Sequence, residues 1–164
     1  MPVYVDNRHP HLRVNKRALA QHVRDCLRLL DRSPAIVDVS LVDDAQIQEL
    51  NNQWRQVDAV TDVLSFALTE AQGPETANEL LGDIVVSLDT AKRQAAAMAT
   101  QFGLSEYGLT QETLFLVTHG LLHLVGHDHQ TAKQAAHMQA LERTLMGPAF
   151  SHNLHALDRT DHGL

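Results

Sequence analysis

The chain has 164 residues, of which 44% are hydrophobic and 20% are charged, and its formal net charge at pH 7 is −7. This length and composition predict one globular domain that can bury its own core. The single cysteine, Cys26, excludes an internal disulfide framework and fits a reducing compartment. Because it lies on the apolar stripe of an expected helix, we expect it to pack in the core rather than react.

The first residues, MPVYVDNRHPHLRV, lack the apolar region of a secretory signal. No stretch approaches the roughly 18 to 20 apolar residues that a membrane span requires. We therefore expect a cytoplasmic protein with no membrane partner.

The charges are unevenly distributed. Residues 1–33 contain seven basic and three acidic residues, a net of +4, whereas the rest of the chain has six basic and seventeen acidic residues, a net of −11. The acidic total argues against non-specific nucleic-acid binding. A basic N-terminal helix could still steer an anionic partner, but a solvated helix face explains the same charges equally well.

Patterns of apolar residues predict the elements of the first half of the chain. We expect a strand at 2–7, a helix at 14–30 and a half-buried strand at 35–42. Asp43 or Asp44 can cap a second helix, whose apolar positions are Ile47, Leu50 and Trp54.

The second half predicts two more strands and then three helices. The strands are expected at 62–68 and 82–88, with a polar loop between them. Asp89 can cap a helix that ends near Gly103, Thr110 can cap one that runs to about Val125, and a further helix is expected at about 131–146. These elements predict an α+β fold, a small mixed four-stranded sheet flanked by about five helices. We expect residues 1–148 to form the single domain and 149–164 a polar, mobile tail.

Histidines are concentrated in the segment HGLLHLVGHDH, residues 119–129. His119 and His123 are four residues apart, so both project from one face of the expected helix and could bind one metal ion. Gly126 lets the chain leave the helix, because glycine accepts left-handed backbone angles, and a tight turn can then return His129 to the same ion. Three imidazoles and one open position are typical of a catalytic zinc site.

A chance histidine pair is the alternative, since this spacing occurs in many helices. However, the surrounding helix is strongly apolar, and burying histidines there costs free energy unless their polar atoms are satisfied. A metal ion would satisfy them, and so would buried carboxylates. The glycine followed by a third histidine favours the metal.

Three segments resemble those of a known family. HGLLHLVGHDH (119–129) resembles the HGxLHLxGYDH motif of the YbeY family, the bacterial endoribonucleases and rRNA maturation factors. NNQWRQVDAVTDVLSFAL (51–68) is similar to that family's N-x-x-[YW]-R-x-x-D-x-x-T-D-V-L-S-F-P stretch, and LGDIVVSLDTAKRQA (81–95) resembles its L-G-D-I-x-I-S segment. The segments agree in order and spacing, and the resemblance covers residues 35–146.

The resemblance implies one zinc ion (Zn²⁺) per chain, held at the positions of His119, His123 and His129. The third histidine follows the second by six residues, a spacing that predicts a metzincin-like metal helix. The resemblance further implies single-strand-specific RNA cleavage linked to maturation of the 16S rRNA 3′ end and to ribosome quality control. The implied partners are rRNA and the small ribosomal subunit or its assembly factors, with no small-molecule cofactor. The same imidazoles would accept other divalent transition metals.

Two positions depart from the family motifs. His127 replaces the usual tyrosine, and either adds a nitrogen near the ion or is a tolerated surface change. Ala67 replaces the usual proline, a change that we expect to affect only the end of a strand.

The charge that gathers on a phosphodiester transition state calls for a nearby cation. Arg55 occupies the family's arginine position, and its planar fork can hold two phosphate oxygens, so we predict that it is a catalytic residue. A salt bridge to Asp58 or another carboxylate is the alternative.

Ligand histidines usually donate their second ring N–H to a carboxylate or a carbonyl group. Asp62, Asp83 and Asp128 are candidates for this role, although capping or turn roles are equally plausible for the first two. Trp54 and Phe66 could stack a base, but we expect both to pack in the core.

Two other functions remain open. Zinc proteases of the HExxH type also place two histidines four residues apart, but Gly120 stands where their glutamate general base would be. The other alternative is a non-catalytic ribosome-assembly factor in which zinc only organises the fold; the expected open coordination position argues against it.

Overall fold

A computed structural model describes residues 3–32, 35–68 and 80–147, and within these ranges the chain forms four strands and five helices. In chain order they are β1 (Val3–Asn7), α1 (Lys16–Leu29), β2 (Ile36–Val42), α2 (Asp44–Arg55), β3 (Val63–Ala67), β4 (Leu80–Ser87), α3 (Leu88–Phe102), α4 (Leu109–Leu124) and α5 (Ala132–Met146). The predicted α+β class is confirmed. The expected tail, 149–164, lies outside the described residues.

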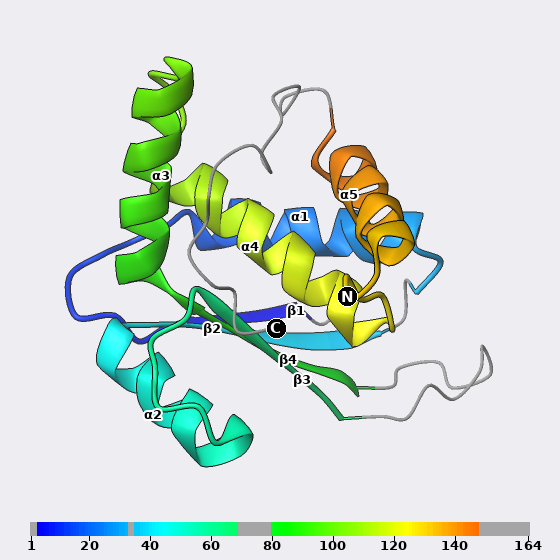
Figure 1. Ribbon diagram of the computed structural model, residues 1–164, viewed down its shortest axis with the longest axis horizontal. Helices are drawn as coiled ribbons and strands as arrows, with labels where there is room; N and C mark the ends of the chain where they lie inside the picture. Colours follow the sequence, from blue (N-terminus) through cyan, green and yellow to red (C-terminus); the bar gives the residue numbers. More distant parts are fainter. Residues whose placement is uncertain (1–2, 33–34, 69–79, 148–164) are drawn as a thin grey trace.

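The strands form one mixed sheet in the order β1-β2-β4-β3. β1, β2 and β4 are parallel, and β3 pairs antiparallel with β4 at one edge. Figure 1 shows α1, α3, α4 and α5 on one side of the sheet and α2 on the other. The sheet therefore has one thickly covered face and one that a single helix covers.

The main core lies between the sheet and the helices on the thickly covered face, and α4 is its centre. Most of α4 is buried, which agrees with its apolar sequence. It contacts β3 and β4 closely at Gly120, where a Cβ atom would lie 3.0 Å from Ile84 Cγ2 and 3.3 Å from Val63 Cγ2. Glycine at this position allows the helix to approach the sheet.

Capping side chains determine where several helices begin. Asp43 caps α2 and forms a capping box with Gln46. Of the two predicted capping residues, Asp43 and Asp44, the first is therefore the cap. The predicted cap at Asp89 is wrong: Ser87, the last residue of β4, caps α3, because the strand runs directly into the helix. The predicted cap at Thr110 is also wrong: the N-cap of α4 is Gly108, and the helix begins at Leu109.

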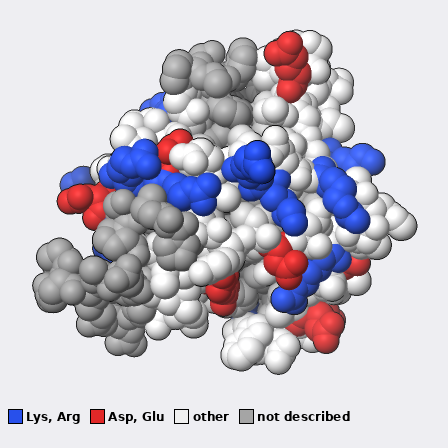
Figure 2. All heavy atoms as spheres, turned by 180° about the vertical axis from the view of Figure 1, so that it is seen from behind, with Lys and Arg blue, Asp and Glu red and all other residues white. Residues whose placement is uncertain are grey.

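The basic helix α1 packs its apolar stripe against the core and exposes its charged face. Cys26 is buried there as predicted, and burial raises its pKa to about 12. Figure 2 shows Lys and Arg side chains gathered in a band across the rear face of the molecule. In the described part of the chain, no helix is both long enough and apolar enough to cross a membrane.

Candidate metal centre

Helix α4 carries the first two histidines of the predicted triad. His119 and His123 lie one turn apart near its C-terminal end, and their ring centroids are 4.9 Å apart. His119 is buried and His123 is half-buried. Both rings therefore leave the same side of the helix, as the spacing predicted.

A turn after α4 brings in the third histidine. Gly126 has a φ of +100°, and the N–H of His127 donates to the Leu122 carbonyl at 2.9 Å, which closes the turn. The ring centroid of His129 lies 5.5 Å from that of His119 and 5.2 Å from that of His123. The predicted convergence of the three histidines is confirmed.

The three side chains could hold one metal ion. One ligand nitrogen from each lies within 4.8 Å of the others. The Nε2 atoms of His123 and His129 are buried and accept or donate no hydrogen bond within the described part of the chain. Buried polar atoms without partners cost free energy, which a shared metal ion would recover.

The protonation of His123 also suits a metal. Burial, followed by the charges of His119 and His129, lowers its pKa to about 4. The imidazole is therefore neutral at neutral pH and retains the nitrogen lone pair that a metal requires.

Glu142 of α5 orients His119. Its Oε2 atom lies 3.2 Å from Nδ1 of His119, and both side chains are buried. This contact leaves Nε2 of His119 as the nitrogen directed at the shared position. A cavity of about 250 Å³ between α4 and α5 adjoins His119, His129 and Glu142, and provides room for a small group beside the triad.

Glu142 was not among the carboxylates predicted for this role. Asp62 accepts a hydrogen bond from Gln94 Nε2 at 3.3 Å, and Asp83 lines a hollow on the opposite face of the sheet. Asp128 acts on the backbone, because its Oδ1 accepts from the N–H of His129 at 2.7 Å. It therefore stabilises the turn that carries the third histidine.

Arg55, the last residue of α2, lies close enough to the triad for its positive charge to contribute to the lowered pKa of His123. Its Nη2 donates to the Ser65 carbonyl at 2.7 Å, and its guanidinium lies 5.5 Å from the centroid of the Phe66 ring. Asp58, the alternative partner, accepts instead from Gln48 at 3.0 Å. The Arg55 side chain is exposed and can be approached by a ligand.

The remaining predictions concern aromatic rings. Trp54 is 62% exposed, so its predicted place in the core is wrong: in the last turn of α2 it lines a hollow that is open to solvent. Phe66 is half-buried against the small apolar cluster beneath α2. The ring of His127 lies 5.4 Å from that of His137, and His127 is not among the three residues of the candidate metal group.

Comparison with known proteins places the chain in a family. The family model described as Endoribonuclease YbeY matches residues 4–149. An Endoribonuclease YbeY of Moorella thermoacetica is 48% identical over 120 residues, 68% of this chain and 71% of that protein. One of Pelotomaculum thermopropionicum is 38% identical over 155 residues, 90% of this chain and 96% of that protein. A Thermotoga maritima protein solved in solution shares the fold, with a TM-score of 0.55 at 23% identity over 97% of this chain and 99% of that one. The chain thus belongs to the YbeY family.

Proposed function

We propose that this protein is a zinc-dependent endoribonuclease in which His119, His123 and His129 hold one zinc ion. The observation that carries the proposal is the convergence of three imidazoles at one point, two of them with buried Nε2 atoms that lack hydrogen bonds in the described chain. The relatives that match this chain bear the name endoribonuclease, which supports RNA as the substrate.

When bound, a zinc ion supplies Lewis acidity, which lowers the pKa of water to about 7 and polarises a phosphoryl oxygen. The protein's own groups then position the substrate. Arg55 binds the phosphate through its planar guanidinium and offsets the charge that develops during attack on phosphorus. Glu142 holds the His119 ring in one tautomer and one orientation. The attacking oxygen comes from water or from the 2′-OH of the RNA.

We further propose that the substrate is single-stranded rRNA at the 3′ end of 16S rRNA, and that the small ribosomal subunit or its assembly factors present it. The resemblance of three separate segments to the YbeY family supports this assignment. The acidic total charge agrees with it, because a protein of net charge −7 gains little from non-specific attraction to RNA and benefits from a partner that presents the strand.

The position of Gly120 disfavours a protease. In HExxH enzymes the residue after the first histidine is the glutamate that accepts the proton of water. Here that residue faces the sheet, where a Cβ atom would lie 3.0 Å from Ile84 Cγ2. A longer side chain at this position requires the sheet or the helix to move.

The test is cleavage of a labelled 16S rRNA 3′-end fragment by zinc-loaded protein, by chelated protein, and by chelated protein to which zinc is returned. We expect cleavage in the first and third cases only, and none of casein. His123→Ala should lose both zinc and cleavage, whereas His127→Ala should keep both. If chelated, zinc-free protein cuts RNA at the full rate, or if His123→Ala still supports cleavage, the proposal is wrong.

A further inference from the structure

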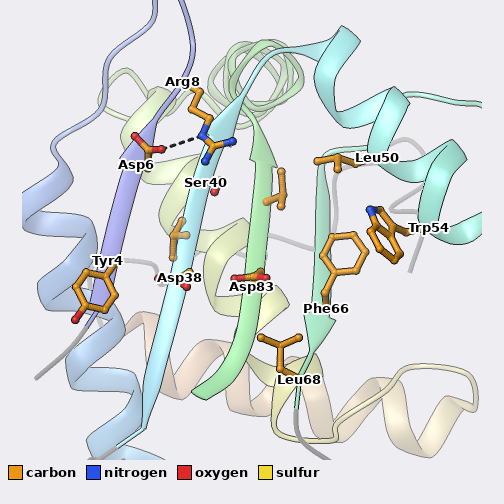
Figure 3. A pocket seen from close by; sticks show the side chains of 12 residues that line it. Tyr4, Asp6, Arg8, Asp38, Ser40, Leu50, Trp54, Phe66, Leu68 and Asp83 are labelled. Atoms are coloured by element: carbon orange, nitrogen blue, oxygen red, sulfur yellow. Dashed lines mark hydrogen bonds and ion pairs between the residues drawn. The ribbon is translucent and has the colours of Figure 1, made fainter. Parts of the chain in front are cut away.

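The thinly covered face of the sheet carries a row of four side chains, one from each strand. Tyr4, Asp38, Asp83 and Phe66 are consecutive register partners across β1, β2, β4 and β3. Neighbouring strands lie about 4.8 Å apart, so each side chain of the row is close to the next. Two carboxyl groups therefore stand between two aromatic rings (Figure 3).

This row forms the floor of a hollow of about 560 Å³ whose wall is completed by Leu50 and Trp54 of α2. Tyr4 is 60% and Trp54 62% exposed, so the rings at both sides can be reached from solvent. Burial, and then the charge of and hydrogen bond with the neighbouring Asp38, raise the pKa of Asp83, as expected for two carboxyl groups side by side. A flat ligand can stack on the aromatic rings of the hollow, and its N–H donors can bond to the carboxyl groups of the floor.

Arg55 connects the hollow with the metal centre. β3 is an edge strand: α4, which carries His119 and His123, packs on one face of it, and the hollow lies on the other face. Arg55 lies at this edge: its Nη2 donates to the Ser65 carbonyl at 2.7 Å, and its guanidinium lies 5.5 Å from the Phe66 ring centroid. A nucleic-acid strand whose phosphate binds Arg55 can therefore place an adjacent base on the rings of Phe66 and Trp54.

The charged residues that line the hollow determine which part of a nucleic acid can enter it. Asp38 and Asp83 repel phosphate, and Arg8, which also lines the hollow, is paired with Asp6 at 2.8 Å, so the backbone stays at Arg55 while the base points inward. Carboxylates accept hydrogen bonds from exocyclic amino groups such as cytosine N4, whereas uracil presents a carbonyl oxygen at the same place. A basic peptide would also suit the two carboxylates, but the charge of Arg55, beside the Phe66 ring that lines the hollow, repels it and attracts a phosphate.

Resting on the proposed function, we propose that this hollow binds one unpaired base of the RNA beside the phosphate held by Arg55. Trp54 and Phe66 stack on the base, and Asp83 accepts a hydrogen bond from its exocyclic amino group. The protein consequently prefers a base with an amino group to uracil at this position.

Trp54 allows a direct test because it is the only tryptophan of the chain. Zinc-loaded protein is titrated with 2′-O-methyl hexanucleotides of cytidine or of uridine while tryptophan fluorescence is recorded. We expect quenching by both oligonucleotides, with a Kd about ten-fold lower for oligocytidine. Dye-labelled oligonucleotides then compare variants by anisotropy. Trp54→Leu should weaken binding about ten-fold, as expected for loss of one stacked base, and Asp83→Asn should bring the two Kd values together. Leu29→Ala on α1, where Leu29 is 64% exposed, is the matched control and should bind as the parent does.

Equal affinity for both oligonucleotides, or unchanged binding by Trp54→Leu, overturns the base pocket. Quenching by an arginine-rich peptide but not by RNA also overturns it, in favour of a protein partner. The two proposals fail separately. If the parent cleaves RNA while Trp54→Leu and Asp83→Asn have an unchanged KM, the pocket is wrong and the nuclease stands. If oligocytidine quenches Trp54 but zinc-loaded protein cuts no RNA, the nuclease is wrong and the pocket stands.

Discussion

Nδ1 of His119 lies 3.2 Å from Oε2 of Glu142, and this contact joins α4 to α5 across 23 residues of chain. A carboxylate at this nitrogen fixes the proton on Nδ1 and leaves the lone pair on Nε2 for a metal. The C-terminal helix thus contributes to the metal centre although it supplies none of the three histidines.

Replacing Glu142 by glutamine tests this role. The amide lacks the negative charge that makes the imidazole a stronger ligand, so we expect Glu142→Gln to bind zinc about 10- to 100-fold more weakly. Competition with a chromophoric chelator measures the affinity. Gln139→Ala is the control, because Gln139 lines the same cavity. Zinc affinity equal to that of the parent protein in Glu142→Gln would show that the contact serves only to dock α5.

Replacing Arg55 should separate metal binding from cleavage. We expect Arg55→Gln to retain one zinc ion and to cleave RNA about 100-fold more slowly, a loss typical of removing one group that stabilises transition-state charge. Arg55→Lys keeps the charge but not the planar guanidinium, so its cleavage rate should lie between those of the parent protein and Arg55→Gln. Cleavage rates and zinc content are measured on the same samples.

The matched control for Arg55 is Arg28→Gln. Arg28 is an exposed arginine of α1 that pairs with Asp25 at 3.2 Å. The Arg28→Gln variant should cleave RNA at the rate of the parent protein. A parental rate in Arg55→Gln as well would remove Arg55 from the site.

Gly120 should be intolerant of even a methyl group. A Cβ atom 3.0 Å from Ile84 Cγ2 overpacks the contact between α4 and the sheet, so we expect Gly120→Ala to lower the free energy of unfolding by about 1–3 kcal/mol. Urea denaturation measures it. Gly103→Ala is not a suitable control, because Gly103 has a φ of +63°, which strains any residue with a Cβ atom. Ala99→Gly in α3, where Ala99 is half-buried, is the control, since it measures how much an exchange of alanine and glycine within a helix changes the free energy of unfolding. Unchanged stability in Gly120→Ala would mean that α4 does not pack this closely.

Local patterns were sufficient to predict the elements and the triad. Alternating Val37, Val39 and Leu41 predicted β2 because a strand buries every second side chain, and they are buried in the structure. His119 and His123 could be paired because helix geometry fixes residues four apart on one face, and Gly126 marked the turn that returns His129.

Relationships between distant segments could not be predicted in this way. Glu142 meets His119 only through the packing of two helices, which no spacing within either helix encodes. The periodicity of α2 placed Trp54 on its apolar stripe, but the packing of α2 on the sheet leaves a hollow there, and the ring is exposed beside it. Likewise, Ser87 caps α3 because β4 leads into it without a loop.

The central claim is that three imidazoles share one metal ion, and X-ray absorption at the zinc edge of the loaded protein tests it most directly. We predict one zinc per chain with three imidazole nitrogens at about 2.0–2.1 Å, unchanged in His127→Ala and reduced in His129→Ala. A spectrum with fewer than three imidazoles in the parent protein, or one that loses an imidazole in His127→Ala, would contradict the account.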